Sequence, residues 1–195
     1  MTFNDVKTQI NIVNSHDKVV ELYNKIKPLP VGYILKNTDD WCAAYVSTIL
    51  YYAGYKKICE CSVPRMIQIA KMLKIWKTGI KPKIGDLVIY DWDSIKDGDH
   101  VGIIIAINGN SLTVKEGNKN NAIGIRVINY YDSKITGFIV IPYENAEKTK
   151  ENTKNSYKTV DEIVSAIIAG KFGNGEDRKN NLYNYFQNLV NIKLK

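Results

Sequence analysis

The sequence predicts an α+β fold in which N-terminal helices pack on an antiparallel sheet. Between residues 4 and 73, apolar residues recur at the spacing of amphipathic helices. Between residues 86 and 141, they form short runs that are separated by turn-forming residues, as in β-strands. Helices followed by an antiparallel meander of strands are typical of α+β domains.

A polar segment, residues 144–157, divides the chain into two predicted domains. Its composition is that of a linker. We therefore expect a first domain at residues 1–143 and a second domain at residues 158–195. The second has two amphipathic stripes around a glycine-rich loop, which predicts a small three-helix module with a thin core.

Three helical segments are expected in the first domain. The first covers residues 4–26 and ends before Pro28 and Pro30. The second starts after Asp39 and Asp40, where an Asp is a good N-cap, and ends before Gly54. The third follows Pro64 and continues to Leu73.

Five strands are expected after Gly85. The pair Asn108-Gly109 is a hairpin signal, so the apolar runs on its two sides are expected to be neighbours in the sheet. The expected strands are residues 86–90, 101–107, 111–116, 123–128 and 137–141.

The net charge of +7 and the pI of about 9.1 favour polyanionic partners. The lysines are spread along the chain, and no zinc-finger or RNA-binding signature accompanies them, so no nucleic-acid partner is expected. A teichoic-acid-bearing cell wall is the other polyanion that fits. A solvated lysine-rich surface with no such partner is an equally simple interpretation.

No segment has the run of about 18 apolar residues that a membrane span requires, so no membrane insertion is expected. The first twenty residues do not combine a basic start with an apolar core, so no secretory signal is expected and synthesis in the bacterial cytoplasm is predicted. The three cysteines are too few and too unevenly spaced for a disulfide framework. Structural zinc at Cys59-x-Cys61 would need further ligands, and we expect neither a metal nor a cofactor.

Cys42 is the strongest candidate for a nucleophile. It stands at the predicted start of the second helix, where free backbone N–H groups and the helix dipole favour an anion. The thiolate is the nucleophilic form of cysteine, and such a position promotes it. The alternative is a buried, inert cysteine.

His100 is the candidate base because it directly precedes the apolar strand 101–107 and can point into a cleft. His16, the other histidine, lies in a polar helical stretch and is expected to be exposed. A catalytic histidine needs a partner that fixes its tautomer and stabilises the imidazolium. Glu116, at the end of the adjacent strand, is the expected partner, and Asn118 is an alternative or additional one.

Four short motifs together identify the first domain as similar to the CHAP family of cysteine, histidine-dependent amidohydrolases/peptidases. Each motif alone is modest, but their order along the chain is specific. The resemblance covers residues 4–143 and implies a compact papain-like fold, with Cys42 as nucleophile, His100 as base, and Glu116 and Asn118 as polar supports. The motifs are Trp41-Cys42-Ala43-Ala44-Tyr45-Val46, Gly85-Asp86-Leu87-Val88, Asp99-His100-Val101-Gly102-Ile103-Ile104 and Glu116-Gly117-Asn118.

Some members of this family bind calcium through alternating aspartates ahead of the cysteine. Residues 37–40 read Asn-Thr-Asp-Asp and depart from that pattern. A second acidic group, Asp91, Asp93, Asp97 and Asp99, lacks the full spacing and the late Glu of a calcium loop, and we expect a solvated acidic turn there.

The second domain resembles the CW-seven repeat, a short cell-wall-binding module of phage lysins, over residues 159–195. The resemblance rests on Asp161-Glu162-Ile163 and on the loop that follows Ala169, although Phe172 stands where the family usually has Trp. A packed helical pair with a structural glycine turn is the alternative. The expected wall-binding residues are Lys171, Gly173, Asn174, Gly175 and Arg178.

The sequence thus predicts a peptidoglycan hydrolase of the endolysin type, released from a phage- or prophage-carrying cell to act on the bacterial cell wall. The scissile amide stays open: either an N-acetylmuramoyl-L-alanine amidase or an endopeptidase of the stem or cross-bridge fits. The alternatives are a non-catalytic wall-binding protein on a hydrolase scaffold and an intracellular thiol protease. The oligomeric state cannot be inferred from the sequence.

Overall fold

The computed structural model describes residues 1–95, 97–144, 159–172, 174–175, 178–179, 182 and 186. The chain divides into two compact units, residues 1–146 and 147–195, which are described separately. The boundary falls inside the predicted linker, but residues 145–158 lie outside the described part of the chain, so the linker itself stays a prediction.

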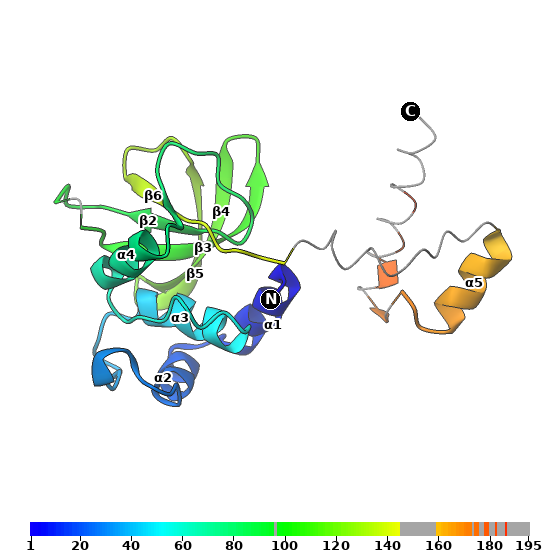
Figure 1. Cartoon of the computed structure of the whole chain (residues 1–195), viewed down its shortest axis with the longest axis horizontal. Helices are drawn as coiled ribbons and strands as arrows, with labels where there is room; N and C mark the ends of the chain where they lie inside the picture. The colour runs from blue at the N-terminus through cyan, green and yellow to red at the C-terminus, as the bar shows by residue number, and fades with distance from the viewer. Residues whose placement is uncertain are drawn as a thin grey trace. The chain divides into compact units, whose positions relative to one another are not determined.

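The first unit begins with its helices (Figure 1). One helix was predicted over residues 4–26, but the chain forms two, because the Ser15 side chain accepts the Lys18 N–H and starts a new helix. The helices are α1 (Phe3–Ile12), α2 (His16–Asn24), the short 3₁₀ turn η1 (Pro30–Gly32), α3 (Cys42–Tyr52) and α4 (Val63–Met72).

Helix α3 is the centre of this unit. Every residue from Cys42 to Leu50 is buried, because α1 and α2 pack on one side of the helix and β3 (His100–Asn108) and β4 (Ser111–Lys119) on another. A helix that is apolar on all sides belongs in a core. The predicted Asp N-cap is wrong: Trp41 occupies the N-cap position, and its side chain does not cap the helix.

The sheet has six antiparallel strands in the order β1-β6-β2-β3-β4-β5. The predicted meander is confirmed for β2 to β5, whereas β6 returns across the sheet to pair with β2. Strand β1 was not predicted, because two residues give no periodic signal. The remaining strands are β1 (Trp76–Lys77), β2 (Leu87–Tyr90), β5 (Ala122–Asn129) and β6 (Ile135–Ile139).

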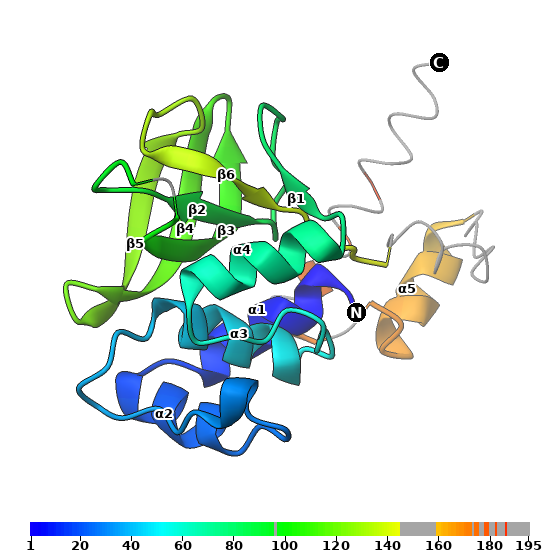
Figure 2. The same ribbon diagram turned by 60° about the vertical axis from the view of Figure 1, so that its left-hand side comes forward.

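Both faces of the central strands are buried. Because side chains alternate along a strand, Leu87 and Ile89 face the helices, and Val88 and Tyr90 face a second, smaller apolar cluster. Figure 2 shows the helices gathered on one side of the sheet. The α+β class with helices packed on an antiparallel sheet is therefore confirmed, and His100 and Glu116 lie on strands that the core holds in place.

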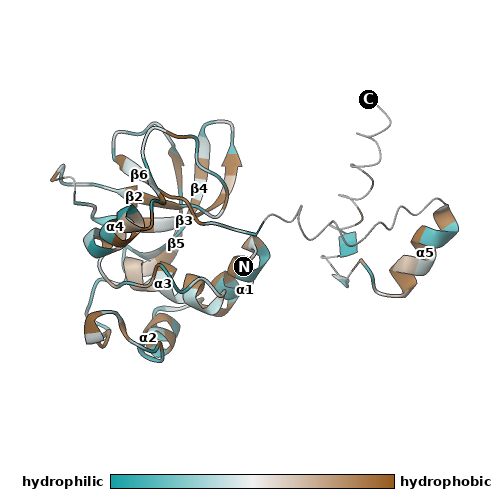
Figure 3. Ribbon diagram, in the orientation of Figure 1, coloured by the Kyte–Doolittle hydropathy of each residue, from teal (hydrophilic) through white to brown (hydrophobic). Residues whose placement is uncertain are grey.

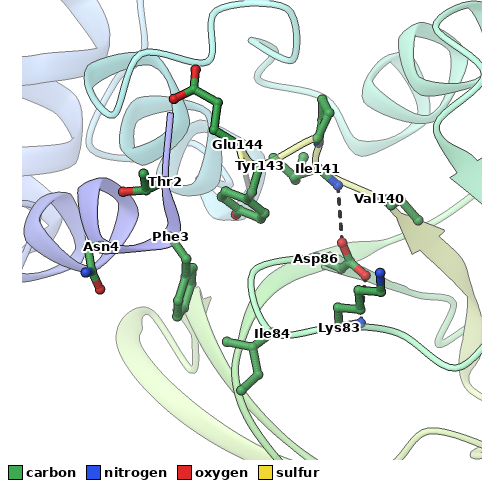
Figure 4. A pocket seen from close by; sticks show the side chains of 11 residues that line it. Thr2, Phe3, Asn4, Lys83, Ile84, Asp86, Val140, Ile141, Tyr143 and Glu144 are labelled. Atoms are coloured by element: carbon green, nitrogen blue, oxygen red, sulfur yellow. Dashed lines mark hydrogen bonds between the residues drawn. The ribbon is translucent and has the colours of Figure 1, made fainter. Parts of the chain in front are cut away.

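The motif residue Asp86 has a structural role at the edge of the sheet. Its buried carboxylate accepts the backbone N–H groups of Lys83 and Ile141, and the Tyr143 hydroxyl donates to the carbonyl of Gly85. Figure 4 shows Asp86 and Tyr143 lining one pocket, with Phe3 of α1 close to the Tyr143 ring. The hydrogen bonds of Asp86 and Tyr143 hold the segment after β6 against the start of β2.

In the second unit the structure describes α5 (Val160–Ile168), which begins with a capping box between Thr159 and Glu162. Apolar residues stand out along this helix in Figure 3, and Val160, Val164 and Ile168 are exposed. The later helices predicted for this unit rest mainly on residues outside the described ones. Across the part of the chain that is described, no helix combines the length and apolar character needed to cross a bilayer.

Candidate active site

Cys42 is the first residue of α3, as predicted. Its side chain is almost buried, with 6% of the residue exposed, among the core residues Trp41 and Ala43. At this position the backbone N–H groups of the first helical turn have no partner within the helix. A thiolate and an oxyanion formed beside it would both lie near the positive end of the helix dipole.

The sheet brings His100 and Glu116 together. Glu116 lies opposite Gly102 in the β3–β4 pair, so it is diagonal to His100 on the same face of the sheet. The His100 Nε2 atom is 3.1 Å from the Glu116 Oε2 atom. Glu116 is completely buried and His100 is 8% exposed, so the pair is shielded from solvent.

Gly102 makes the space in which Glu116 reaches His100. A Cβ atom at this position would lie 2.8 Å from Glu116 Cγ and 2.4 Å from Val114 Cγ1. Both distances are shorter than real Cβ contacts, so any larger residue would displace these side chains. The glycine of the motif Asp99-His100-Val101-Gly102 therefore serves the geometry of the pair.

The electrostatics of His100 favour its protonated form. Burial by itself lowers the pKa of His100, but hydrogen bonding and charge from Cys42 and Glu116 outweigh burial and raise it to about 9. Because Nε2 faces Glu116, Nδ1 is the nitrogen left for the Cys42 sulfur. The arrangement can therefore keep the His100 ring protonated at neutral pH, next to the Cys42 sulfur.

Arg126 of β5 forms an ion pair with Glu116, a role that was not predicted. Its Nε atom donates to Glu116 Oε1 at 2.7 Å, and its Nη2 atom donates to Oε2 at 3.1 Å. Burial would raise the pKa of Glu116, but the hydrogen bonds from His100 and Arg126 hold it below its usual value. The sequence contained one signal for this role: Arg126 is the only charged residue in the apolar run 123–128.

Asn118 lies near the site but contacts a different residue from the one expected. Its Nδ2 atom donates to Asp40 Oδ1 at 2.8 Å, and its φ of 57° turns the end of β4. Asp40 belongs to the segment that enters α3, so Asn118 ties β4 to the approach to Cys42. Gly117 packs so closely on α3 that a Cβ atom there would lie 2.5 Å from Tyr45 Cβ.

His16 is not exposed as expected. Its ring stacks on Trp41 with centroids 4.5 Å apart and an interplanar angle of 10°, and the residue is half-buried. It therefore covers the tryptophan that precedes Cys42.

The acidic loop is only partly solvated. Asp93, Asp97 and Asp99 are exposed, but Asp91 is buried. Carboxylate oxygens of Asp91, Asp93 and Asp99 lie within 4.8 Å of one another. Each of these three carboxylates accepts backbone N–H groups of the same loop, with Ser94, Ile95 and Trp92 among the donors. This turn geometry accounts for their proximity.

The predicted wall-binding residues follow α5 along the chain, and of these Gly175 and Arg178 are helical. Lys171, Asn174 and Gly175 are exposed, and Arg178 Nη2 donates to Asn174 Oδ1 at 3.0 Å. Gly173 lies outside the described residues.

The Gly102→Ala substitution tests the geometry of the His100–Glu116 pair. We expect the raised pKa of His100 to fall, because the new methyl group pushes Glu116 away from the ring. Overpacking also costs about 1–3 kcal/mol of stability. NMR titration of the two histidines measures the pKa.

Gly124→Ala is the matched control, because the three atoms nearest to a Cβ atom there belong to the Lys119 side chain and not to Glu116. A His100 pKa that stays near 9 in Gly102→Ala would show that the contact between His100 and Glu116 does not depend on a glycine at position 102.

Two models of known protein families match parts of the chain. The model of the CHAP domain matches residues 34–118, a range that contains Cys42, His100, Glu116 and Asn118. The model of the CW_7 repeat matches residues 161–194. No curated protein sequence matches the chain significantly. The α+β structure agrees with the papain-like fold implied by the sequence motifs, and the matches to the CHAP domain and to the CW_7 repeat follow one another along the chain.

Proposed function

We propose that this protein is a cysteine-dependent peptidoglycan hydrolase in which Cys42 is the nucleophile and His100 the acid–base. The observation that carries the proposal is the arrangement of Cys42, His100 and Glu116 at the junction of α3 and the sheet, within a CHAP domain. The CHAP domain indicates a family of peptidoglycan hydrolases, and the CW_7 repeat suggests binding to the cell wall.

The first chemical step is attack on an amide. With the proton of Cys42 on His100, the thiolate attacks the carbonyl carbon and a tetrahedral oxyanion forms. The Cys42 backbone N–H at the start of α3 is positioned to donate to that oxyanion. Glu116 keeps the imidazolium oriented through Nε2, which leaves Nδ1 toward the sulfur.

The second step expels the amine and regenerates the enzyme. Protonated His100 gives its proton to the leaving nitrogen as the C–N bond breaks, and a thioester with Cys42 remains. Neutral His100 then takes a proton from water, whose oxygen attacks the thioester. The carboxylic acid product departs, and the thiolate–imidazolium pair is restored.

The proposed substrate is an amide of the stem peptide or cross-bridge of bacterial peptidoglycan. Both an N-acetylmuramoyl-L-alanine amidase and an endopeptidase use this chemistry, and mass spectrometry of digested wall fragments distinguishes them. A wall-binding repeat beside a lytic domain fits an endolysin of a phage or prophage that reaches the wall after release from the cytoplasm. The net charge of +7 suits an anionic wall.

Cys42→Ala should abolish the cleavage of purified cell walls while wall binding is retained, because the thiolate is the only nucleophile in the scheme. Turbidity of a wall suspension measures cleavage, and co-sedimentation measures binding.

Cys59→Ser and Cys61→Ser are the controls and should keep most activity. Burial raises the pKa of the Cys59 thiol to about 11 and also raises that of Cys61, so neither is a thiolate at neutral pH. Wall cleavage by Cys42→Ala near the wild-type rate would contradict the mechanism and favour another reaction centre.

Activity should fall as the pH rises through about 9. The pKa of His100 is raised from 6.5 to about 9, so the imidazolium that protonates the leaving amine is complete below 6.5 and half lost near 9. Glu116→Gln should move this alkaline limb to lower pH, because the neutral amide no longer favours the imidazolium. The measurement is kcat against pH on soluble muropeptides, with His100→Ala as the inactive reference. If the alkaline limb is unchanged in Glu116→Gln, Glu116 does not influence the pKa of His100 during catalysis.

The second unit should contribute binding and not chemistry. A protein ending at residue 146 should cleave soluble muropeptides at the full rate but lyse intact walls less efficiently, because tethering raises the effective concentration at an insoluble substrate. The wall affinity of the full chain should weaken with added salt. Lysis assays on walls and muropeptides in parallel test this. Equal efficiency of both proteins on intact walls would leave the CW_7 repeat without a role in lysis.

A further inference from the structure

Arg126 occupies the far side of the buried carboxylate from His100. It stands on β5 opposite Val114, which is two residues from Glu116 and on the same face of the sheet. Its two donors contact both oxygens of Glu116 at 2.7 and 3.1 Å. A bidentate contact of this kind fixes the plane of the carboxylate. Oε2 is thereby held at the distance at which it accepts the His100 Nε2–H.

Two aromatic rings hold the guanidinium in turn. Its Cζ atom lies 5.3 Å from the Tyr90 ring centroid and 4.8 Å from that of Trp92. These two rings stack on each other with centroids 5.0 Å apart, and Tyr90 also lies 5.8 Å from the His100 ring. Arginine stacks on aromatic faces better than lysine, so the two rings hold the planar guanidinium of Arg126 in one orientation.

The titratable and charged groups around His100 come from four elements. Cys42 approaches from α3, Glu116 from β4 and Tyr90 from β2, and Arg126 of β5 acts through Glu116. A buried carboxylate with no other partner would bind the imidazolium proton very tightly. The guanidinium compensates the charge of Glu116, so the carboxylate orients His100 and still lets it release the proton.

We propose that Arg126 is a positioning residue of this site, which fixes Glu116 and offsets its charge so that His100 can cycle between acid and base. The role rests on the proposed hydrolase function, but its electrostatic part belongs to the folded protein itself. Arg126 lies outside the range matched by the CHAP domain model and outside the four sequence motifs.

The chain contains a second ion pair of the same type that serves as an internal control. Arg65 Nη2 lies 2.8 Å from Glu60 Oε1, and Glu60 is buried like Glu116. This pair contacts Cys61, and among the described residues it forms no hydrogen bond or ion pair with His100. A purely structural role for Arg126 predicts that Arg126→Gln and Arg65→Gln behave alike.

The test compares Arg126→Gln, Arg126→Lys and Arg65→Gln as full-length proteins. Three properties are measured: the His100 pKa by NMR, with His16 as internal reference, the pH profile of Cys42 alkylation by iodoacetamide, and kcat and KM on soluble muropeptides. Arg126→Gln should raise the His100 pKa above that of the wild type. Its kcat should fall on the order of 10- to 100-fold, by analogy with residues that orient the ligands of metal sites. Its KM should stay near that of the wild type.

Arg126→Lys keeps the positive charge but loses the bidentate contact with Glu116. It should restore the His100 pKa and recover only part of kcat. Arg65→Gln should lower stability and leave the His100 pKa and the alkylation profile unchanged. If Arg126→Gln does not fold, Arg126→Lys is the variant that tests the proposal. Full activity of Arg126→Lys would show that the bidentate contact with Glu116 is not required.

A His100 pKa in Arg126→Gln that is unchanged or lowered would overturn the proposal. The pKa and alkylation measurements need no peptidoglycan, so they test Arg126 even if the wild type cleaves no muropeptide. That last result would instead refute the proposed function. A wild type that cleaves muropeptides, with Arg126→Gln equally active, would refute the role of Arg126 alone.

Discussion

The site depends on a carboxylate that is completely removed from water. Glu116 is 0% exposed, and an isolated charge in such a place is strongly unfavourable unless it is paired and hydrogen-bonded. His100 satisfies it from one side and Arg126 from the other. The strand order β3-β4-β5 explains this, because the three residues come from three adjacent strands and point to the same face of the sheet.

The rest of the fold provides space for that arrangement and places the nucleophile next to it. Gly102 leaves room for Glu116, and Gly117 lets β4 approach α3 closely enough for Cys42 to meet His100. Asn118 ties the end of β4 to Asp40, just before α3. The short sequence motifs therefore contain two kinds of residue: those proposed to take part in the chemistry, and glycines and polar residues that position them.

The sequence was sufficient for features that depend on local periodicity, and insufficient for those that depend on pairing across the sheet. Helices α3 and α4 and strands β2 to β6 followed from apolar spacing, and the motifs located Cys42, His100 and Glu116. The return of β6 to β2 and the role of Arg126 could not be predicted, because both arise between segments distant in sequence. The helix break before Ser15 and the partial burial of His16 were not predicted, because the local polarity suggested one exposed helix. The partial burial of His16 arises from its stacking on Trp41, which is distant in sequence.

The proposed mechanism requires Cys42 to form a thioester with the acyl side of a peptidoglycan amide. The most direct measurement is intact-protein mass spectrometry after rapid acid quenching of the enzyme with soluble muropeptides, followed by peptide mapping. We expect an added mass equal to the acyl fragment on the peptide that contains Cys42. Hydroxylamine should release this mass, and Cys42→Ala should not acquire it. Turnover of the muropeptide with no adduct on that peptide at any quench time, and with the same rate in Cys42→Ala, would contradict the proposed mechanism.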